Sequence, residues 1–277
     1  MPEVFEYSFM HRAFIIGNLI AIIAPTIGVF LILKRLALIG NTLSHVALAG
    51  IALGLLTGIY PVYLAILISV VAALGVERLR SKFSDYAELS LSIILASGLG
   101  IATILISLSR NSAGIMSYLF GSITLVTKID LYTVVPLAIV IMGIIFIFFY
   151  GFFYISFNEQ DARMAGVPVR FLNIIFMIII SITIALSMRI VGGLLIASLI
   201  SIPVAVSLQL ARSFKQTIFY SVLTGIVSVN TGLILSFYYD LAPGGTIIIT
   251  NVFCFLIVVF IKFITKKITR GVSSYEY

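Results

Sequence analysis

Long apolar runs, separated by short stretches that hold most of the charged residues, constrain this chain more than any other feature. A helix needs about 20 consecutive apolar residues to cross the hydrocarbon core of a bilayer. The sequence predicts such spans at about 13–33, 36–58, 60–76, 89–108, 131–157, 171–188, 190–211, 217–239 and 244–265. The runs are continuous rather than alternating, which excludes a transmembrane β-barrel. We therefore expect a single domain over residues 1–277, an all-α polytopic transmembrane helix bundle of about nine spans (eight to ten).

The composition indicates that lipid is the solvent for most of the chain. Only 10% of the residues are charged and the mean hydropathy is +1.24, whereas soluble domains average about 25% charged residues. The net charge of +7 is spread over short groups between the runs, which argues against nucleic acid as a partner. A single cysteine, Cys254, excludes an internal disulfide and a multi-cysteine metal site.

Two stretches depart from the pattern of plain spans. The segment 110–130 is too polar and broken for a span, and indicates a loop with a short helix or a re-entrant segment buried in protein. The N-terminus starts acidic and no small-residue cleavage pattern follows it, so we expect the first span to be retained rather than removed as a signal peptide.

The positions of Lys and Arg predict the orientation, because cytoplasmic loops carry an excess of both. With nine spans, the loops of one side hold 13 of the 17 basic residues, namely Lys34, Arg35, Arg78, Arg80, Lys82, Arg163, Arg170, Arg212, Lys215, Lys262, Lys266, Lys267 and Arg270. The other side holds Arg12, Arg110, Lys128 and Arg189. We therefore expect the N-terminus outside the cell and the C-terminus in the cytoplasm.

The second run contains the first candidate site. Asn41 and His45 are four residues apart and share a helix face, beside Ser44, near the middle of the bilayer. An ionisable residue at that depth is a functional candidate, and neutral imidazole is a common ligand of transition metals. The alternative is a hydrogen bond from His45 to a neighbouring helix. Gly50, with Gly54 and Gly58, forms a small-residue stripe about 140° around the helix from His45, so the polar face points away from the closest packed neighbour.

Other polar residues lie in or near later spans. Ser228 and Asn230 form a polar cluster in the eighth run, where they line a pathway or bond between helices. Asp240 ends that run on the outer side. It belongs to a turn with the following Pro and two Gly, and an acidic residue at an outer mouth also attracts cations.

The connector 156–170 is the longest charged loop on the predicted cytoplasmic side. We expect Glu159, Asp161 and Ala162 in a short surface helix that ends at Gly166. Its simplest interpretation is a solvated connector, and the more specific one is a contact with an ATPase.

Motifs of catalysis are missing from the sequence. There is no G-x-x-x-x-G-K-[ST] phosphate loop, no G-x-S-x-G and no H-E-x-x-H, and the only histidines are His11 and His45. We therefore predict a protein that is not an enzyme and cannot hydrolyse ATP by itself.

Five segments together resemble the zinc/manganese family of ABC-importer permeases: ILKRLALIGNTLSHVALAGIALG, MSYLFGSITLV with a spaced Asp130, NEQDARMAGV, VGGLLIASLISIPVAVS and DLAPGGTIII. The resemblance runs from about Phe9 to Lys266. It implies a homodimeric permease in a prokaryotic cell membrane, with two copies of a separate ABC ATPase and an extracellular solute-binding protein that delivers the metal. It also implies that His45 is a metal ligand and that the stretch from Glu159 to Gly166 meets the ATPase.

The resemblance also bears on the substrate. It implies a divalent cation, zinc, manganese or iron, that is carried as substrate, with no permanently bound cofactor. The family usually has aspartate where this chain has Asn41, which removes a negative charge from the pathway.

Two other classes of protein remain as alternatives. A secondary transporter driven by an ion gradient usually needs titratable residues inside the membrane, and His45 is the only one well placed within the predicted spans. A structural or assembly membrane protein would carry no substrate. Co-purification with an ATPase separates the permease from both, and proton- or sodium-dependent uptake without ATP indicates the secondary transporter.

Overall fold

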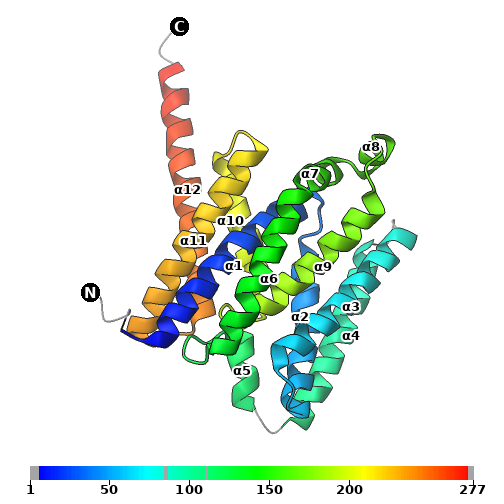
Figure 1. Cartoon of the computed structure of the whole chain (residues 1–277). Helices are drawn as coiled ribbons and strands as arrows, with labels where there is room; N and C mark the ends of the chain where they lie inside the picture. Colours follow the sequence, from blue (N-terminus) through cyan, green and yellow to red (C-terminus); the bar gives the residue numbers. More distant parts are fainter. Residues whose placement is uncertain (1–5, 84–86, 110–111, 274–277) are drawn as a thin grey trace.

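The computed structural model describes residues 6–83, 87–109 and 112–273. Over these residues the chain is built from helices without strands (Figure 1). The helices are α1 (Ser8–Leu33), α2 (Leu38–Thr57), α3 (Pro61–Lys82), α4 (Ala87–Leu108), α5 (Ser112–Phe120), α6 (Lys128–Ile147), α7 (Phe149–Phe157), α8 (Glu159–Met164), α9 (Val169–Ser187), α10 (Ile196–Leu210), α11 (Phe214–Tyr239) and α12 (Pro243–Ser273). The all-α prediction is confirmed.

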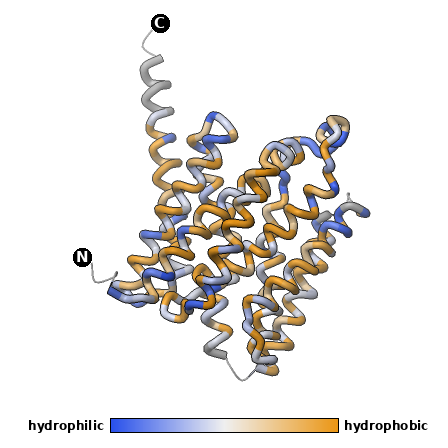
Figure 2. Tube along the Cα trace, viewed as in Figure 1, coloured by the Kyte–Doolittle hydropathy of each residue, from blue (hydrophilic) through white to orange (hydrophobic). Residues whose placement is uncertain are grey.

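Eight of these helices are long and apolar enough to cross a membrane, namely α1, α2, α3, α4, α6, α9, α11 and α12. Figure 2 shows hydrophobic residues through the middle of the bundle and hydrophilic ones toward its two ends. The ninth predicted span corresponds to α10, whose 15 residues extend only about 22 Å. We call the end of the bundle where Lys34, Arg80 and Glu159 meet the basic side. The other end, where the Ser122 amide donates to the Arg189 carbonyl, is called the opposite side.

The predicted span 190–211 is wrong in its first part, because α10 begins only at Ile196 and the chain from 188 to 195 is not a regular helix. Backbone amides of this irregular segment form hydrogen bonds with the end of α5. The Gly193 and Leu194 amides donate to the carbonyls of Tyr118 and Leu119. Irregular backbone is tolerated at membrane depth where protein supplies its hydrogen bonds. The segment 110–130 accordingly contains the short helix α5 and a loop packed on the break, as one of the two predicted forms has it.

A second difference concerns the predicted span 131–157. It starts three residues earlier and is divided into α6 and α7 at Phe148. The start is fixed by a capping box, in which Thr127 and Asp130 exchange hydrogen bonds between side chain and backbone. The first turn of α6, and with it Asp130, therefore lies on the opposite side of the bundle beside Arg189.

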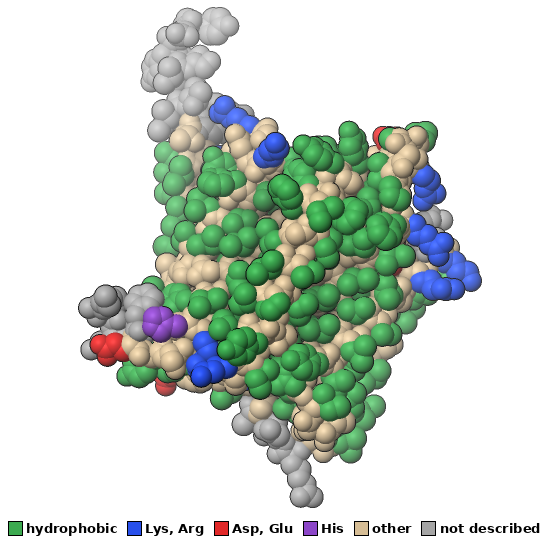
Figure 3. All heavy atoms as spheres, in the orientation of Figure 1, with side chains coloured by type: hydrophobic (Ala, Val, Ile, Leu, Met, Phe, Trp, Pro, Cys, Tyr) green, Lys and Arg blue, Asp and Glu red, His purple; other side chains and the backbone are tan. Residues whose placement is uncertain are grey.

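Close helix contacts hold the bundle together at glycines. A side chain on Gly50 or Gly54 of α2 would collide with the backbone of Ala65 or Pro61 in α3, as the stripe of small residues predicts. Gly225 of α11 likewise faces the Ala21 carbonyl of α1. The outward faces are apolar, and Figure 3 shows hydrophobic side chains covering the middle of one of them, as expected of a surface in lipid.

The charge bias of the loops predicts which side of this bundle faces the cytoplasm. In Figure 1 helix α1 begins at the lower left of the bundle, and the C-terminal helix α12 runs upward along the bundle and extends beyond its upper end. Among the basic residues counted in this bias, Arg110 lies outside the described residues. For 266–273, which contain three more of them, only the backbone is described. We therefore propose that the basic side faces the cytoplasm.

Cysteine labelling across α11 tests this orientation. In a chain with Cys254 replaced by alanine, we expect Leu241→Cys to react with an impermeant maleimide in intact cells. Arg212→Cys, exposed at the other end of the same helix, should react only after permeabilisation. The reverse pattern would contradict the predicted orientation.

Candidate functional site

A narrow accessible stripe runs along α2, which is otherwise buried in the bundle. Asn41 and His45 are half-buried, and Leu38, three residues before Asn41, is 57% exposed. The intervening Thr42, Leu43 and Ser44 are buried. Because helical residues three and four apart share a face, Asn41 and His45 lie on the one side of this part of α2 that the chain itself leaves uncovered.

The side chains of Asn41 and His45 make no hydrogen bond or ion pair with the described part of the chain. A polar side chain inside the membrane is costly without a partner. Ser44 differs, since it is 2% exposed and its hydroxyl donates to the Gly40 carbonyl 2.7 Å away within α2. The two accessible side chains are therefore available to a ligand or a second protein, while Ser44 is already satisfied.

One chain does not provide a complete metal centre at this stripe. Within the described residues, no three His, Cys, Asp or Glu side chains lie close enough together to hold a metal ion. His45 contributes one imidazole and Asn41 one amide oxygen, whereas zinc is usually bound by four ligands. A second copy of the stripe would be needed to complete such a site.

The predicted pathway residues of α11 lie elsewhere. Asn230 and Asn18 of α1 donate to each other's amide oxygens at 2.7 and 3.1 Å, which joins the two helices. Ser228 is 0% exposed, and its hydroxyl has no partner in the described structure. Asp240 is exposed at the end of α11, in the left-handed conformation with φ of 51°. The structure does not bring these residues to Asn41 and His45. For Asn230, the hydrogen bond between helices is the second of its two predicted roles.

The predicted surface helix in the connector 156–170 is present as α8. Asn158 starts it by accepting hydrogen bonds from the Gln160 and Asp161 amides, and Gly166 follows it with φ of 81°. Asp161 is exposed and accepts from the Asn158 side chain at 2.7 Å. Ala162 is 1% exposed and holds the helix against the bundle. The outer face of α8 is thus open to a partner.

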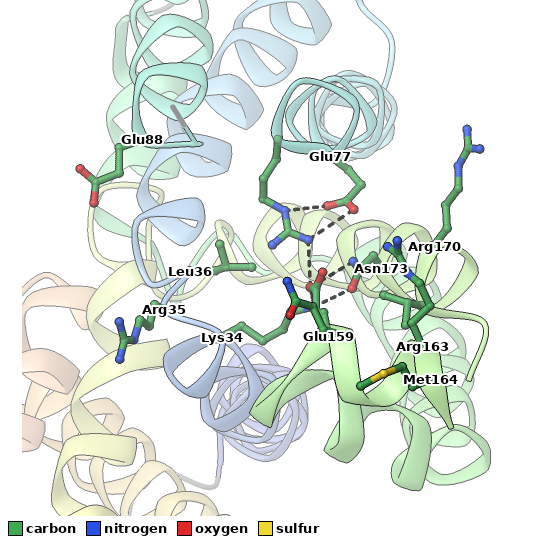
Figure 4. A pocket seen from close by; sticks show the side chains of 13 residues that line it. Lys34, Arg35, Leu36, Glu77, Glu88, Glu159, Arg163, Met164, Arg170 and Asn173 are labelled. Carbon is green, nitrogen blue, oxygen red and sulfur yellow. Dashed lines mark hydrogen bonds and ion pairs between the residues drawn. The ribbon is translucent and has the colours of Figure 1, made fainter. Parts of the chain in front are cut away.

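Glu159 does not point to solvent with the rest of α8. Its carboxylate lies 2.9 Å from the Lys34 ammonium and 3.2 Å from the Arg80 guanidinium, and it accepts from Asn173 at 3.2 Å. Figure 4 shows Lys34, Glu159 and Asn173 pointing toward one another. Together with Arg80 they line one hollow of about 800 Å³. We call Lys34, Arg80, Glu159 and Asn173 the basic-side cluster. It ties α8 to the ends of α1, α3 and α9.

Charge pairing sets the protonation of this cluster. Burial alone would raise the pKa of Glu159, but Lys34 and Arg80 outweigh it and hold that pKa below the ordinary 4.5. Burial lowers the pKa of Lys34 below 10.5, and Glu159 opposes the shift. A carboxyl with a depressed pKa stabilises the folded state above its ordinary pKa and loses that contribution as the pH falls through the lowered value.

A second buried cluster lies on the opposite side, and sequence reasoning did not find it. Asp130, 2% exposed, forms an ion pair with Arg189 at 3.3 Å and accepts a hydrogen bond from Tyr60. The Arg189 guanidinium also stacks over the Tyr118 ring at 4.8 Å and donates to the Leu125 carbonyl. It therefore fixes the irregular chain before α10 to the start of α6.

These features define a multi-pass membrane protein with a polar, uncovered stripe on one spanning helix and a surface helix braced by ion pairs. The chain belongs to the ABC 3 transport family, whose sequence profile matches residues 6–262.

Similar proteins agree in length and fold. A "Probable metal transport system membrane protein" of Treponema pallidum is 35% identical, over 92% of this chain and 96% of that protein. The "High-affinity zinc uptake system membrane protein ZnuB" of Haemophilus influenzae is 29% identical, over 92% and 98%. Among solved structures, "PsaBC from Streptococcus pneumoniae in complex with Fab" contains a chain with a TM-score of 0.83 and 28% identity, and the match covers 92% of each chain.

Proposed function

We propose that this chain is the membrane-spanning subunit of an ATP-driven importer of a divalent metal cation, zinc or manganese. The observation that carries the proposal is the stripe on α2, where Asn41 and His45 are accessible at depth and lack partners in the chain. Zinc and manganese enter the proposal through relatives named as a zinc uptake protein and as manganese transport proteins.

The pathway follows from the solvation of the ion. A bare divalent cation has a prohibitive cost in hydrocarbon, so a pathway must offer replacement ligands. If two copies of the chain meet at a two-fold axis along the α2 stripe, two imidazoles and two amide oxygens converge. Such a site lacks fixed negative charge and binds weakly, which suits a conduit that must release its ion. In such a dimer the α2 stripe of the second copy also covers Asn41 and His45 of the first.

In this proposal, ATP hydrolysis acts on the chain at its basic side. A separate ATPase subunit would contact the exposed face of α8, including Asp161, and an extracellular solute-binding protein would deliver the ion on the opposite side. Glu159 acts one step inward, because its ion pairs connect α8 to α1 and α3. Movement of α8 would therefore be passed to the chain that leads from α1 into α2.

The energy source separates this proposal from a secondary transporter. Uptake of labelled metal is measured in cells that express the chain with its ATPase, under two conditions. In the first, ATP is depleted. In the second, ATP is present and ionophores have collapsed the proton and sodium gradients. We expect uptake to stop without ATP and to continue without the gradients. Uptake that follows the gradients alone would assign the chain to the secondary transporters.

A further inference from the structure

An accessible face of α10 lies next to the stripe on α2. Ala197, Ser201 and Ala205 are half-buried and follow one another at intervals of four residues, so they share one side of the helix. Leu199 and Val206, on the other side of α10, are buried in the bundle. The chain thus leaves a face of small residues on α10 uncovered, in addition to the stripe.

The two helices meet at Gly40. A side chain added at Gly40 would place its Cβ atom 3.8 Å from the Ala197 Cα atom and 3.6 Å from the Ile200 Cδ1 atom. From this contact α2 runs toward the opposite side, because it starts beside Leu36 in the hollow of the basic side. Helix α10 runs toward the basic side, because it starts after the irregular segment that pairs with α5 on the opposite side. Ser201 therefore lies about 6 Å nearer to the basic side than Ala197, four residues before it.

The open faces of the two helices point the same way. Viewed from the basic side, successive residues turn clockwise along α2 and counterclockwise along α10, because both helices are right-handed and run in opposite directions. Asn41 is turned about 100° from Gly40, and Ser201 is turned about 40° from Ala197 in the opposite sense. Both rotations lead to the same side of the contact, so Asn41, His45 and Ser201 lie on one common side of the bundle.

The hydroxyl of Ser201 has no internal partner. Serines in helices commonly donate to a carbonyl of the preceding turn, as Ser44 of α2 and Ser207 of α10 do. The side chain of Ser201 makes no hydrogen bond within the described structure. Its oxygen is therefore available to a ligand on the side that it shares with the stripe.

We infer that Ser201 is a further ligand for the transported cation, between the α2 stripe and the basic side. This inference rests on the proposed function, because it assigns the hydroxyl to the same ion. The side chains of Asn41 and Ser201 lean toward each other, since Cα–Cβ bonds tilt toward the start of a helix and the two starts are adjacent. An ion that leaves His45 toward the basic side thus meets an amide oxygen and then a hydroxyl oxygen. Both are neutral ligands that replace hydration water.

Thiol labelling in membranes tests the position of Ser201 without reference to metal. In a chain with Cys254 replaced by alanine, Ser201→Cys should react with a small water-soluble methanethiosulfonate at least about tenfold faster than Ile139→Cys, since a hydrated thiol ionises more readily than one in lipid. Ile139, 65% exposed on the spanning helix α6, represents the outward apolar surface. Ser207→Cys, at a position that is 0% exposed, should not react. Equal rates for Ser201→Cys and Ile139→Cys would overturn the inference and leave the proposed function standing.

Uptake of the transported metal tests the role of the hydroxyl. Ser201→Thr keeps the hydroxyl, and Ser201→Val has nearly the same shape as the threonine variant without it, so the two form a matched pair. We expect Ser201→Thr to take up metal at the wild-type rate and Ser201→Val to be about fivefold slower, the effect of losing one polar contact. Equal uptake by the two variants, at equal amounts in the membrane, would overturn the inference. No uptake even by the wild-type chain would instead overturn the proposed function, and with it the assignment of the ion.

Discussion

Replacing His45 with alanine is expected to reduce metal uptake to the background of cells that lack the chain. The imidazole is the only nitrogen ligand that the uncovered stripe of α2 offers near the bilayer centre. In a two-fold site its loss removes two of four ligands at once. The remaining amide oxygens cannot offset the dehydration of a divalent ion. The substitution should leave folding intact, because His45 is half-buried and bonds to nothing in the described chain.

Two neighbouring variants make this result specific. Ser44→Ala should retain uptake, since the Ser44 hydroxyl is bonded to its own helix and faces away from the stripe. Asn41→Asp should also retain uptake and change the preference among metals, because a carboxylate adds negative charge to the site. Normal uptake by His45→Ala, with the protein present in the membrane at wild-type level, would remove His45 from the pathway.

Replacing Glu159 with glutamine is expected to abolish most uptake, by disconnecting α8 from the bundle rather than by removing a metal ligand. The variant loses the ion pairs to Lys34 and Arg80 and leaves the Lys34 side chain, 3% exposed, with Asn173 as its partner in the basic-side cluster. Loss of hydrogen bonds to a buried charge costs roughly 1–3 kcal/mol, which a thermal unfolding measurement in detergent would detect. Uptake falls because α8 is no longer connected to α1 and α3, even where the ATPase still binds.

The matched control is Asp161→Asn on the same helix. The Asp161 carboxylate accepts a hydrogen bond from the Asn158 side chain within the described structure, and the substitution should not alter thermal stability. The pH dependence provides a second readout. Since the pKa of Glu159 is held below 4.5, the stability difference between wild type and Glu159→Gln should persist down to about pH 4.5 and shrink below it. Wild-type stability and uptake in Glu159→Gln would show that the cluster does not connect α8 to the bundle. A stability difference that grows as the pH falls would contradict the assigned ion pairs.

Local patterns in the sequence were sufficient for the parts of the fold that depend on one helix. The charged and small residues after Asn158, with Gly166 at the end, predicted α8. The glycine spacing in α2 predicted a close contact with a neighbouring helix, which the structure shows to be α3, and a polar face at His45 turned away from that contact. Both depend on helical periodicity and on the left-handed conformation that glycine adopts, which are properties of neighbouring residues.

Features that depend on distant parts of the chain could not be predicted this way. The run at 188–195 is apolar like a span, and only the backbone groups of Tyr118 and Leu119 make its irregular path acceptable. Hydropathy reports burial in lipid or protein but not regular helix. Glu159 shows the same limitation of local patterns. The sequence placed it in a surface helix, and only the fold brings it to Lys34 and Arg80. The ion pair of Asp130 with Arg189 joins residues 59 positions apart and has no local signature.

The most direct test of the central claim is accumulation of zinc, manganese and iron in cells with and without this chain, measured by elemental mass spectrometry. The cells also express the ATPase and the solute-binding protein, and His45→Ala is measured in parallel. We predict that zinc or manganese accumulates only when the wild-type chain is present. Equal accumulation of all three metals with and without the chain would contradict the assignment of this protein as a metal permease.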